Sequence, residues 1–213
     1  WLQAGLLHLS DLPERHFLVP KYASITTQQR TFGYTLEDER VLLGPMARTG
    51  AEPIGSMGTD TPIAVLSQRP RLLFDYFKQL FAQVTNPPLD AIREEIITTM
   101  ASTIGPEGNL LEPAPEACRQ IAIEYPILHN DQVAKLRHLP TGSPFRSTTL
   151  PLLYDPAEGG PGLARAMAEL CRKASQAVAS GYGVIILSDR GVDATHAPIP
   201  SLLATAGVHH HLV

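Results

Sequence analysis

The chain has 213 residues, of which 44% are hydrophobic and 18% are charged, and its formal net charge is −4. This much apolar material can build a globular core, and the balance excludes an intrinsically disordered chain. A weakly acidic chain has no general electrostatic attraction for nucleic acid or for an anionic membrane. No apolar run approaches the roughly 20 residues that a membrane-spanning helix needs. We therefore expect no nucleic-acid partner and no membrane partner.

The two cysteines, Cys118 and Cys171, belong to no C-x-x-C pattern and to no Cys/His ligand pair. This favours two reduced thiols in a reducing compartment. The chain begins at Trp1 without a methionine and stops inside an apolar segment. We therefore expect both ends to have been cut from something longer.

The first half of the chain is predicted to be rich in helix. Residues 1–34 are only weakly periodic. The first clear element is predicted to start at Thr35, because Asp38 occupies the capping-box position and Val41, Leu42 and Leu43 follow it. Pro45 is predicted to end this helix, since proline lacks the amide donor.

The strongest helical pattern of the first half starts at Pro70. Its apolar residues recur at helical spacing and are Leu73, Phe74, Phe77, Leu80, Phe81 and Val84. A following helix is predicted to be capped by Asp90. Its apolar side is predicted to comprise Ile92, Ile96, Met100 and Ile104.

From residue 148 the pattern changes to alternating strands and helices. "TTLPLLYD" is typical of an imperfect or edge strand, because it contains Pro151. A long helix follows from about Pro161, with Gly181 just beyond its end. "YGVIILSD" predicts a strand buried on both faces of a parallel sheet, and a further helix follows Pro198. Strand, helix, strand and helix in this order predict an α/β fold.

The glycine-rich stretch "GSMGTDT" is the first candidate site. Its glycines free the backbone and its hydroxyls could help to bind an anion; the residues concerned are Gly55, Ser56, Gly58, Thr59, Asp60 and Thr61. It is neither a Walker loop nor a dinucleotide fingerprint. A tight structural loop is the alternative interpretation.

The stretch "SDRGVDATH" is the second candidate, because ligands of parallel α/β sheets bind beyond the carboxyl ends of strands. Its polar residues are Ser188, Asp189, Arg190, Asp193 and His196. Asp189 and Arg190 could form an ion pair, and Asp193 and His196 could form an acid–base couple. The alternative is a polar network that fixes this loop to the next helix.

Three consecutive histidines, His209, His210 and His211, lie near the C-terminus. Successive residues of a helix point about 100° apart, so these side chains do not converge on a metal ion. We expect no metal site here. His210 is expected to be packed or hydrogen-bonded on the side shared by Leu203, Ala206 and Val213, with His209 and His211 pointing elsewhere. No serine or cysteine has a nearby base that would mark a nucleophile, so no catalytic residue is predicted.

Several longer stretches together resemble the central domain of glutamate synthase, of the large or ferredoxin-dependent type. They are "GSMGTDTPIAVLSQRPRLLFDYFKQLFAQVTNPPLDAIREE", "TIGPEGNLLEP", "GYGVIILSDRG" and "HAPIPSLLATAGVHHHLV". The resemblance covers nearly the whole chain and is loose over residues 125–155.

The resemblance implies a larger enzyme that converts L-glutamine, 2-oxoglutarate and a reductant into two L-glutamate. An amidotransferase domain would release ammonia, and an FMN-binding barrel with an iron–sulfur cluster would use it. The central domain would link the two, help to form the ammonia tunnel and hold no cofactor. Ferredoxin or an NAD(P)H-oxidising small subunit would supply electrons, in the bacterial cytoplasm or the plastid stroma.

The resemblance also implies a fold and boundaries. We expect an incomplete, barrel-related βα domain with a helix-rich N-terminal half. Residues 1–34 would connect it to a preceding amidotransferase domain, and residues 35–213 would form the central domain, truncated at its C-terminus. The glycine-rich stretch would face the tunnel or a domain junction, with Thr59 and Thr61 as the leading residues. Asp60 could instead fix the loop or help to gate it.

Two other functions stay open at this point. One is an autonomous α/β enzyme that uses the loop from Asp189 to His196. The other is a small anion-binding module that uses the loop from Gly55 to Thr61.

Overall fold

The structure is a computed structural model that describes residues 1–17, 25–51, 53, 63–69, 71–79, 81–82, 88–105, 108–109, 111–141 and 143–213. The described α-helices are α1 (Leu2–Gly5), α2 (Ile25–Thr31), α3 (Gly44–Thr49), α4 (Ala91–Ile97), α5 (Asn130–Arg137), α6 (Gly159–Ala179) and α7 (Ser201–Leu212). The described strands are β1 (Leu6–His8), β2 (Ser102–Ile104), β3 (Gln120–Ile123), β4 (Ser147–Pro151), β5 (Leu153–Tyr154), β6 (Val184–Ser188) and β7 (Ala197–Pro198). Shorter helical turns are η1 (Leu9–Asp11), η3 (Asp38–Leu43), η4 (Ala64–Leu66), η5 (Leu73–Tyr76), η6 (Pro115–Cys118) and η7 (Pro156–Glu158).

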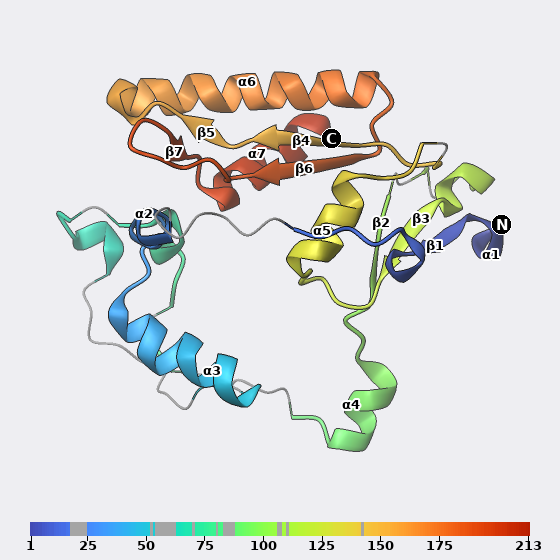
Figure 1. Cartoon of the computed structure of the whole chain (residues 1–213), viewed down its shortest axis with the longest axis horizontal. Coiled ribbons are helices and arrows are strands. Elements are labelled where there is room, and N and C mark those ends of the chain that lie inside the picture. The colour runs from blue at the N-terminus through green and yellow to red at the C-terminus, as the bar shows by residue number, and fades with distance from the viewer. Residues whose placement is uncertain are drawn as a thin grey trace.

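The C-terminal part is built on a β–α–β unit. β4 and β6 pair in parallel, with Thr149 opposite Ile186, and the long helix α6 connects them. Figure 1 shows α6 running alongside these strands. α6 and α7 pack on this unit through one cluster of buried residues, which contains Leu150, Leu152, Leu170, Ala174, Ile199, Ala204 and Val208. The predicted strand, long helix, strand and final helix are therefore confirmed.

A second sheet has the order β1-β3-β2, with β1 parallel and β2 antiparallel to β3. Its core contains Leu9, Leu12, Ile121, Ile123, Leu136 and Phe145. β6 joins the two cores, because Ile185 and Leu187 pack against the first and Ile186 packs against the second. The continuous apolar run of β6 is explained by this packing on both faces.

The prediction of a helix from Pro70 is wrong over the described residues. Only the single 3-10 turn η5 forms there, and Phe77 ends it. Phe74 and Phe77 are exposed. Helices of this length depend on tertiary packing of their apolar face, and this face has little to pack against. Pro70, Leu80 and Val84 lie outside the described residues.

Pro45 does not end the helix that starts near Thr35, so this prediction is also wrong. The capping box itself is confirmed, because the Thr35 amide donates to Asp38 Oδ2 at 2.8 Å and the Asp38 amide donates to Thr35 Oγ1 at 3.1 Å. The π-helical η3 leads directly into α3, which contains Pro45 in its first turn and ends at Gly50 with a φ of 66°. Pro45 lacks an amide donor, but it lies where the π-helical spacing of η3, in which the Gly44 amide donates to the Glu39 carbonyl, changes to the α-helical spacing of α3.

The helix capped by Asp90 is shorter than predicted. Asp90 Oδ1 accepts from the Arg93 amide at 2.9 Å, which confirms the cap. α4 nevertheless ends before Thr98, and Ile104 belongs to β2, where it lies opposite Ile121. Strand pairing beside a fully buried isoleucine overrides the helical spacing there.

The structure is thus a mixture of helices and small sheets. Three expectations stay predictions: that the fold is related to a barrel, that the domain is incomplete, and that its boundary follows residue 34.

Candidate functional site

The glycine-rich candidate site lies outside the described residues. All six of its members fall in the range 54–62, which the structure does not describe. The interpretation of Gly55, Ser56, Gly58, Thr59, Asp60 and Thr61 therefore stays a prediction.

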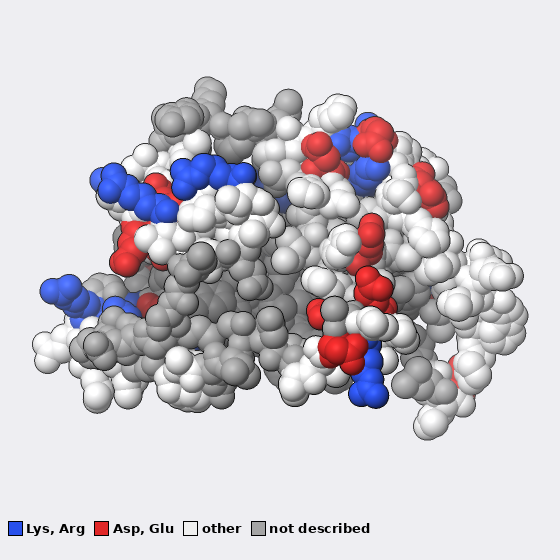
Figure 2. All heavy atoms as spheres, turned by 90° about the horizontal axis from the view of Figure 1, so that it is seen from below, with Lys and Arg blue, Asp and Glu red and all other residues white. Residues whose placement is uncertain are grey.

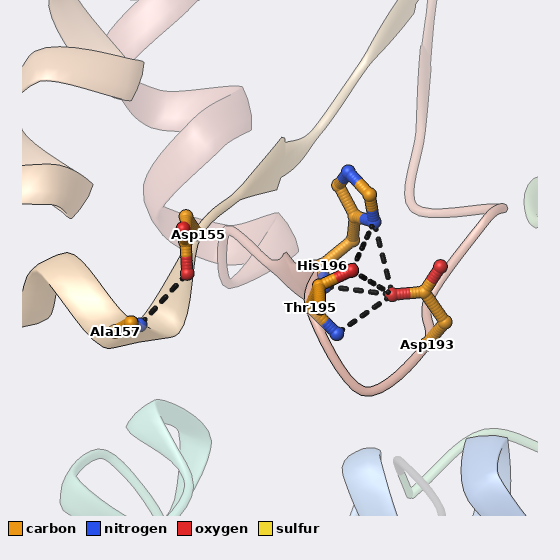
Figure 3. Close-up of polar contacts among 5 residues, drawn as sticks. All are labelled: Asp155, Ala157, Asp193, Thr195 and His196. Carbon is orange, nitrogen blue, oxygen red and sulfur yellow. Dashed lines mark hydrogen bonds and ion pairs between the residues drawn. The ribbon is translucent and has the colours of Figure 1, made fainter.

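The loop after β6 brings Asp193 and His196 together, as predicted. Asp193 Oδ1 accepts hydrogen bonds from the Thr195 amide at 2.8 Å, the Thr195 hydroxyl at 2.9 Å and the His196 amide at 2.9 Å. The Nδ1 atom of His196 lies 2.9 Å from the same oxygen. Figure 3 shows the ring and the hydroxyl converging on this one carboxylate.

This network is solvent-exposed, with 54% of the His196 side chain and 57% of the Asp193 side chain accessible. Hydrogen bonds lower the pKa of Asp193 to about 2. The hydrogen bond from the Thr195 amide lowers this pKa most, followed by those from the His196 ring and the Thr195 hydroxyl. Such a carboxylate is a weak base, so its geometry suits orienting His196 and closing the turn before β7.

Two other residues of the loop contact a different part of the molecule. Ser188 is buried at the end of β6, and its hydroxyl accepts from Arg137 Nη2 of α5 at 3.2 Å. Arg190 Nη2 donates to Asn130 Oδ1 at 3.0 Å. Within the described part of the chain, Asp189 and Arg190 form no ion pair closer than 4.0 Å. No hydrogen bond or ion pair of the described residues joins this group to Asp193 and His196.

Sequence reasoning missed the residues of α5 that meet this loop. Asn130, Ala134, Arg137 and His138 lie on one face of α5, at i, i+4, i+7 and i+8. They line a hollow of about 250 Å³ together with Arg190 and with His16 and Phe17 of the N-terminal segment. The helical spacing of polar residues in "NDQVAKLRH" was the available signal, but nothing in the sequence placed this face beside the loop.

A second helix start lies near the same end of the C-terminal unit. Asp155 Oδ1 accepts from the Ala157 amide at 2.9 Å and so caps η7, which leads into α6 (Figure 3). Figure 3 shows Asp155 pointing to its own helix and not to Asp193. It therefore has a local structural role.

The C-terminal histidines lie on α7, but the expected packing of His210 is wrong. The buried positions of α7 are Ala204 and Val208, and His210 is exposed. The helical phase places His211 next on the packed side, where its Nε2 atom lies 2.8 Å from Ser175 Oγ of α6. Among the described residues, no group of three or more His, Cys, Asp and Glu side chains could hold a metal ion.

The described helices include none that is both long enough and apolar enough to cross a membrane. The described surface does expose many large apolar side chains. The most exposed are Val65, Leu66, Phe77, Ile92, Ile96, Leu111 and Ile127. Figure 2 shows that charged side chains occupy only separate patches of the face that it presents. These features describe a domain that has an extensive apolar surface, with polar loops that mainly stabilise its own turns.

Comparison with known proteins assigns this domain to a family. The family description "Glutamate synthase central domain" matches residues 27–213. The chain is 45% identical over 183 residues to glutamate synthase [NADH] of Schizosaccharomyces pombe, and the aligned part covers 85% of this chain and 9% of that protein. It is 38% identical over 213 residues to the glutamate synthase [NADPH] large chain of Bacillus subtilis, covering 100% of this chain and 14% of that protein.

A plant relative shows the same relationship. The chain is 42% identical over 217 residues to ferredoxin-dependent glutamate synthase 2, chloroplastic, of Arabidopsis thaliana, covering 100% of this chain and 13% of that protein. The chain belongs to the glutamate synthase central domain family. It spans between 9% and 14% of the length of these three relatives.

Proposed function

We propose that this chain is the linking and ammonia-tunnel-forming domain of a glutamate synthase, which converts L-glutamine, 2-oxoglutarate and a reductant into two L-glutamate. The observation that carries the proposal is the family match over residues 27–213. Relatives named for NADH, NADPH and ferredoxin share this segment. A segment common to all three has a role that does not depend on the electron donor.

The exposed apolar surface supports a linking role. Phe77, Ile92 and Ile96 are each more than 70% exposed, and Leu111 is 90% exposed. Exposed apolar side chains that group into patches mark surfaces that contact other domains or proteins. The amidotransferase and FMN-binding domains of the same chain are the partners that fit this surface.

The cofactors of the enzyme are assigned to those other domains. The chain has two cysteines, whereas an iron–sulfur cluster is commonly held by four cysteine thiolates. The cluster therefore does not fit this segment, and we expect neither the cluster nor FMN to bind here. No independent chemistry is expected of the segment. Ferredoxin or an NAD(P)H-oxidising small subunit would serve the whole enzyme, in the bacterial cytoplasm or the plastid stroma.

The tunnel role follows from the chemistry of ammonia. Ammonia released into water at neutral pH would mostly become ammonium, which is not a nucleophile. An enclosed path of hydroxyl groups and backbone carbonyls would pass ammonia on by hydrogen bonds without protonating it. Thr59 and Thr61 could supply such hydroxyls, and Asp60 could fix or gate the loop.

The test uses full-length enzyme with Thr59→Trp or Thr61→Trp. A bulky side chain in the tunnel should raise the ratio of glutamine hydrolysed to 2-oxoglutarate converted above one and release ammonium. Thr205→Trp, at an exposed position of α7, is the matched control. A ratio that stays at one in both loop variants would contradict the proposed position of the tunnel.

A further inference from the structure

The hollow between α5, the loop after β6 and the N-terminal segment carries an excess of positive charge. Arg137 and Arg190 both line it, and His138 and His16 lie at its edge. In the described part of the chain, neither arginine has a carboxylate within 4.0 Å. Two arginines that line one hollow without a counter-charge repel each other, and an anion between them would relieve this repulsion.

Arg137 carries a charge beside this hollow that the described residues do not compensate. Its Nη2 atom donates to the neutral hydroxyl of Ser188, and its Nε atom is buried and has no hydrogen-bond partner among the described residues. A guanidinium that is partly removed from water without a counter-charge costs free energy. An anion in the hollow would compensate this charge.

The orientation of the Arg190 guanidinium is fixed by two contacts. Its guanidinium lies over the Phe17 ring, 4.3 Å from the ring centre, and donates to Asn130. Stacking and one hydrogen bond fix the plane of the group while leaving other donors available. A planar guanidinium fixed in this way binds carboxylate or phosphate oxygens with little further loss of entropy.

Asp131, which follows Asn130 in α5, forms no ion pair with either arginine in the described structure. Asp131 instead accepts from the Phe17 amide at 2.6 Å and lies 3.8 Å from His16 Nδ1. The charge of Arg137 and Arg190 remains available to a ligand.

We propose that this hollow binds a small oxyanion, a free carboxylate or phosphate, between Arg137 and Arg190. Its volume of about 250 Å³ suits a small metabolite. The site depends on the contacts of this chain alone, so an enzyme without an ammonia tunnel would still contain it.

The test measures arginine modification in the full-length enzyme. Phenylglyoxal labels accessible arginines, and peptide mass spectrometry reports the labelling rates of Arg190 and Arg137 separately. Inorganic phosphate and glutarate are the two probes. At a probe concentration about ten times its Kd, labelling of Arg190 should slow about tenfold. Arg48 of α3, which is exposed and far from the hollow in sequence, should be labelled at an unchanged rate.

Variants show whether protection is local. Arg137→Gln should weaken the protection of Arg190 by about tenfold or more in probe concentration, because a charge-assisted bond is lost. Arg48→Gln should leave it unchanged. Protection by glutarate alone would identify a carboxylate site, and protection by phosphate alone would identify a phosphate site.

Two results would overturn the proposal. In one, neither probe slows the labelling of Arg190 in the wild-type enzyme. In the other, Arg190 is already unreactive without a probe, because the rest of the protein fills the hollow. Both results are independent of the ratio of glutamine to 2-oxoglutarate, so this inference can fail while the tunnel role stands.

Discussion

Asp193 organises the turn before β7 through one oxygen. The donors on Asp193 Oδ1 come from Thr195 and His196, so the carboxylate replaces backbone hydrogen bonds that a tight turn cannot make. The same arrangement explains why an apparent acid–base couple is better understood as a structural cap.

A pH titration tests this role of Asp193. Its pKa is about 2 in the folded chain and about 3.9 in an unfolded one. A lowered pKa contributes stability that is present above the unfolded value and is lost as the pH falls through the folded value. Thermal melting should therefore show wild type more stable than Asp193→Asn at pH 5, with the difference disappearing towards pH 2. A difference that is constant across this range would contradict the role of the charge.

Ile199 is the residue on which the first core depends most directly. It is 1% exposed, and its amide donates to the Leu152 carbonyl at 2.8 Å. Ile199→Ala should lower the free energy of unfolding by about 2–5 kcal/mol, because the cavity adds to the lost transfer energy. Ile92→Ala, at a position that is 75% exposed, should change it by no more than about 0.5 kcal/mol. Denaturant unfolding of the 213-residue chain measures both, and equal losses would show that the assigned core is wrong.

At the scale of elements, the contact between α6 and α7 requires small residues. Ala174 of α6 and Ala204 of α7 are both fully buried, and a Cβ atom at Gly207 would lie 2.5 Å from Met167 Cε. The two helices therefore approach closely, and their facing positions have no room for larger side chains.

Ala174→Leu tests this close approach. Overpacking should destabilise the chain by about 1–3 kcal/mol, and Ala168→Leu on the exposed side of the same helix should have little effect. Chemical denaturation gives both values. If the two variants unfold at the same denaturant concentration, the helices do not pack as described.

The elements also show what the sequence could predict. The pattern of α6, β6 and α7 agrees with their environment, since apolar residues of these elements pack together with Leu150 and Leu152 in one core. The pattern around Phe77 was equally strong and produced only a 3-10 turn, because amphipathic spacing does not show whether a partner surface exists. Similarly, Arg137 and Arg190 meet through tertiary packing, which no local pattern of either segment could indicate.

At the scale of the whole molecule, several large apolar side chains from η4 to α4 are exposed. Phe77, Ile92 and Ile96 contribute little to the core of the described chain. Under the linking role proposed above, other domains of a larger enzyme would cover them.

A surface variant tests this interpretation. Ile92→Ser combined with Ile96→Ser should leave the stability of the 213-residue chain within about 0.5 kcal/mol of wild type, because both side chains are exposed. In full-length enzyme the same variant should speed proteolysis at the domain junctions. Unchanged proteolysis in the full-length enzyme would show that this surface contacts no other domain.

We propose that this domain encloses the path of ammonia, and an isotope-dilution experiment follows that path. Full-length enzyme would receive glutamine labelled with ¹⁵N in its amide group, 2-oxoglutarate, a reductant and excess unlabelled ammonium. The glutamate formed from 2-oxoglutarate should keep the full label in wild type and lose part of it in Thr59→Trp or Thr61→Trp. Label diluted in the wild-type enzyme to the proportion in the surrounding solution would show that the path of ammonia is open to solvent.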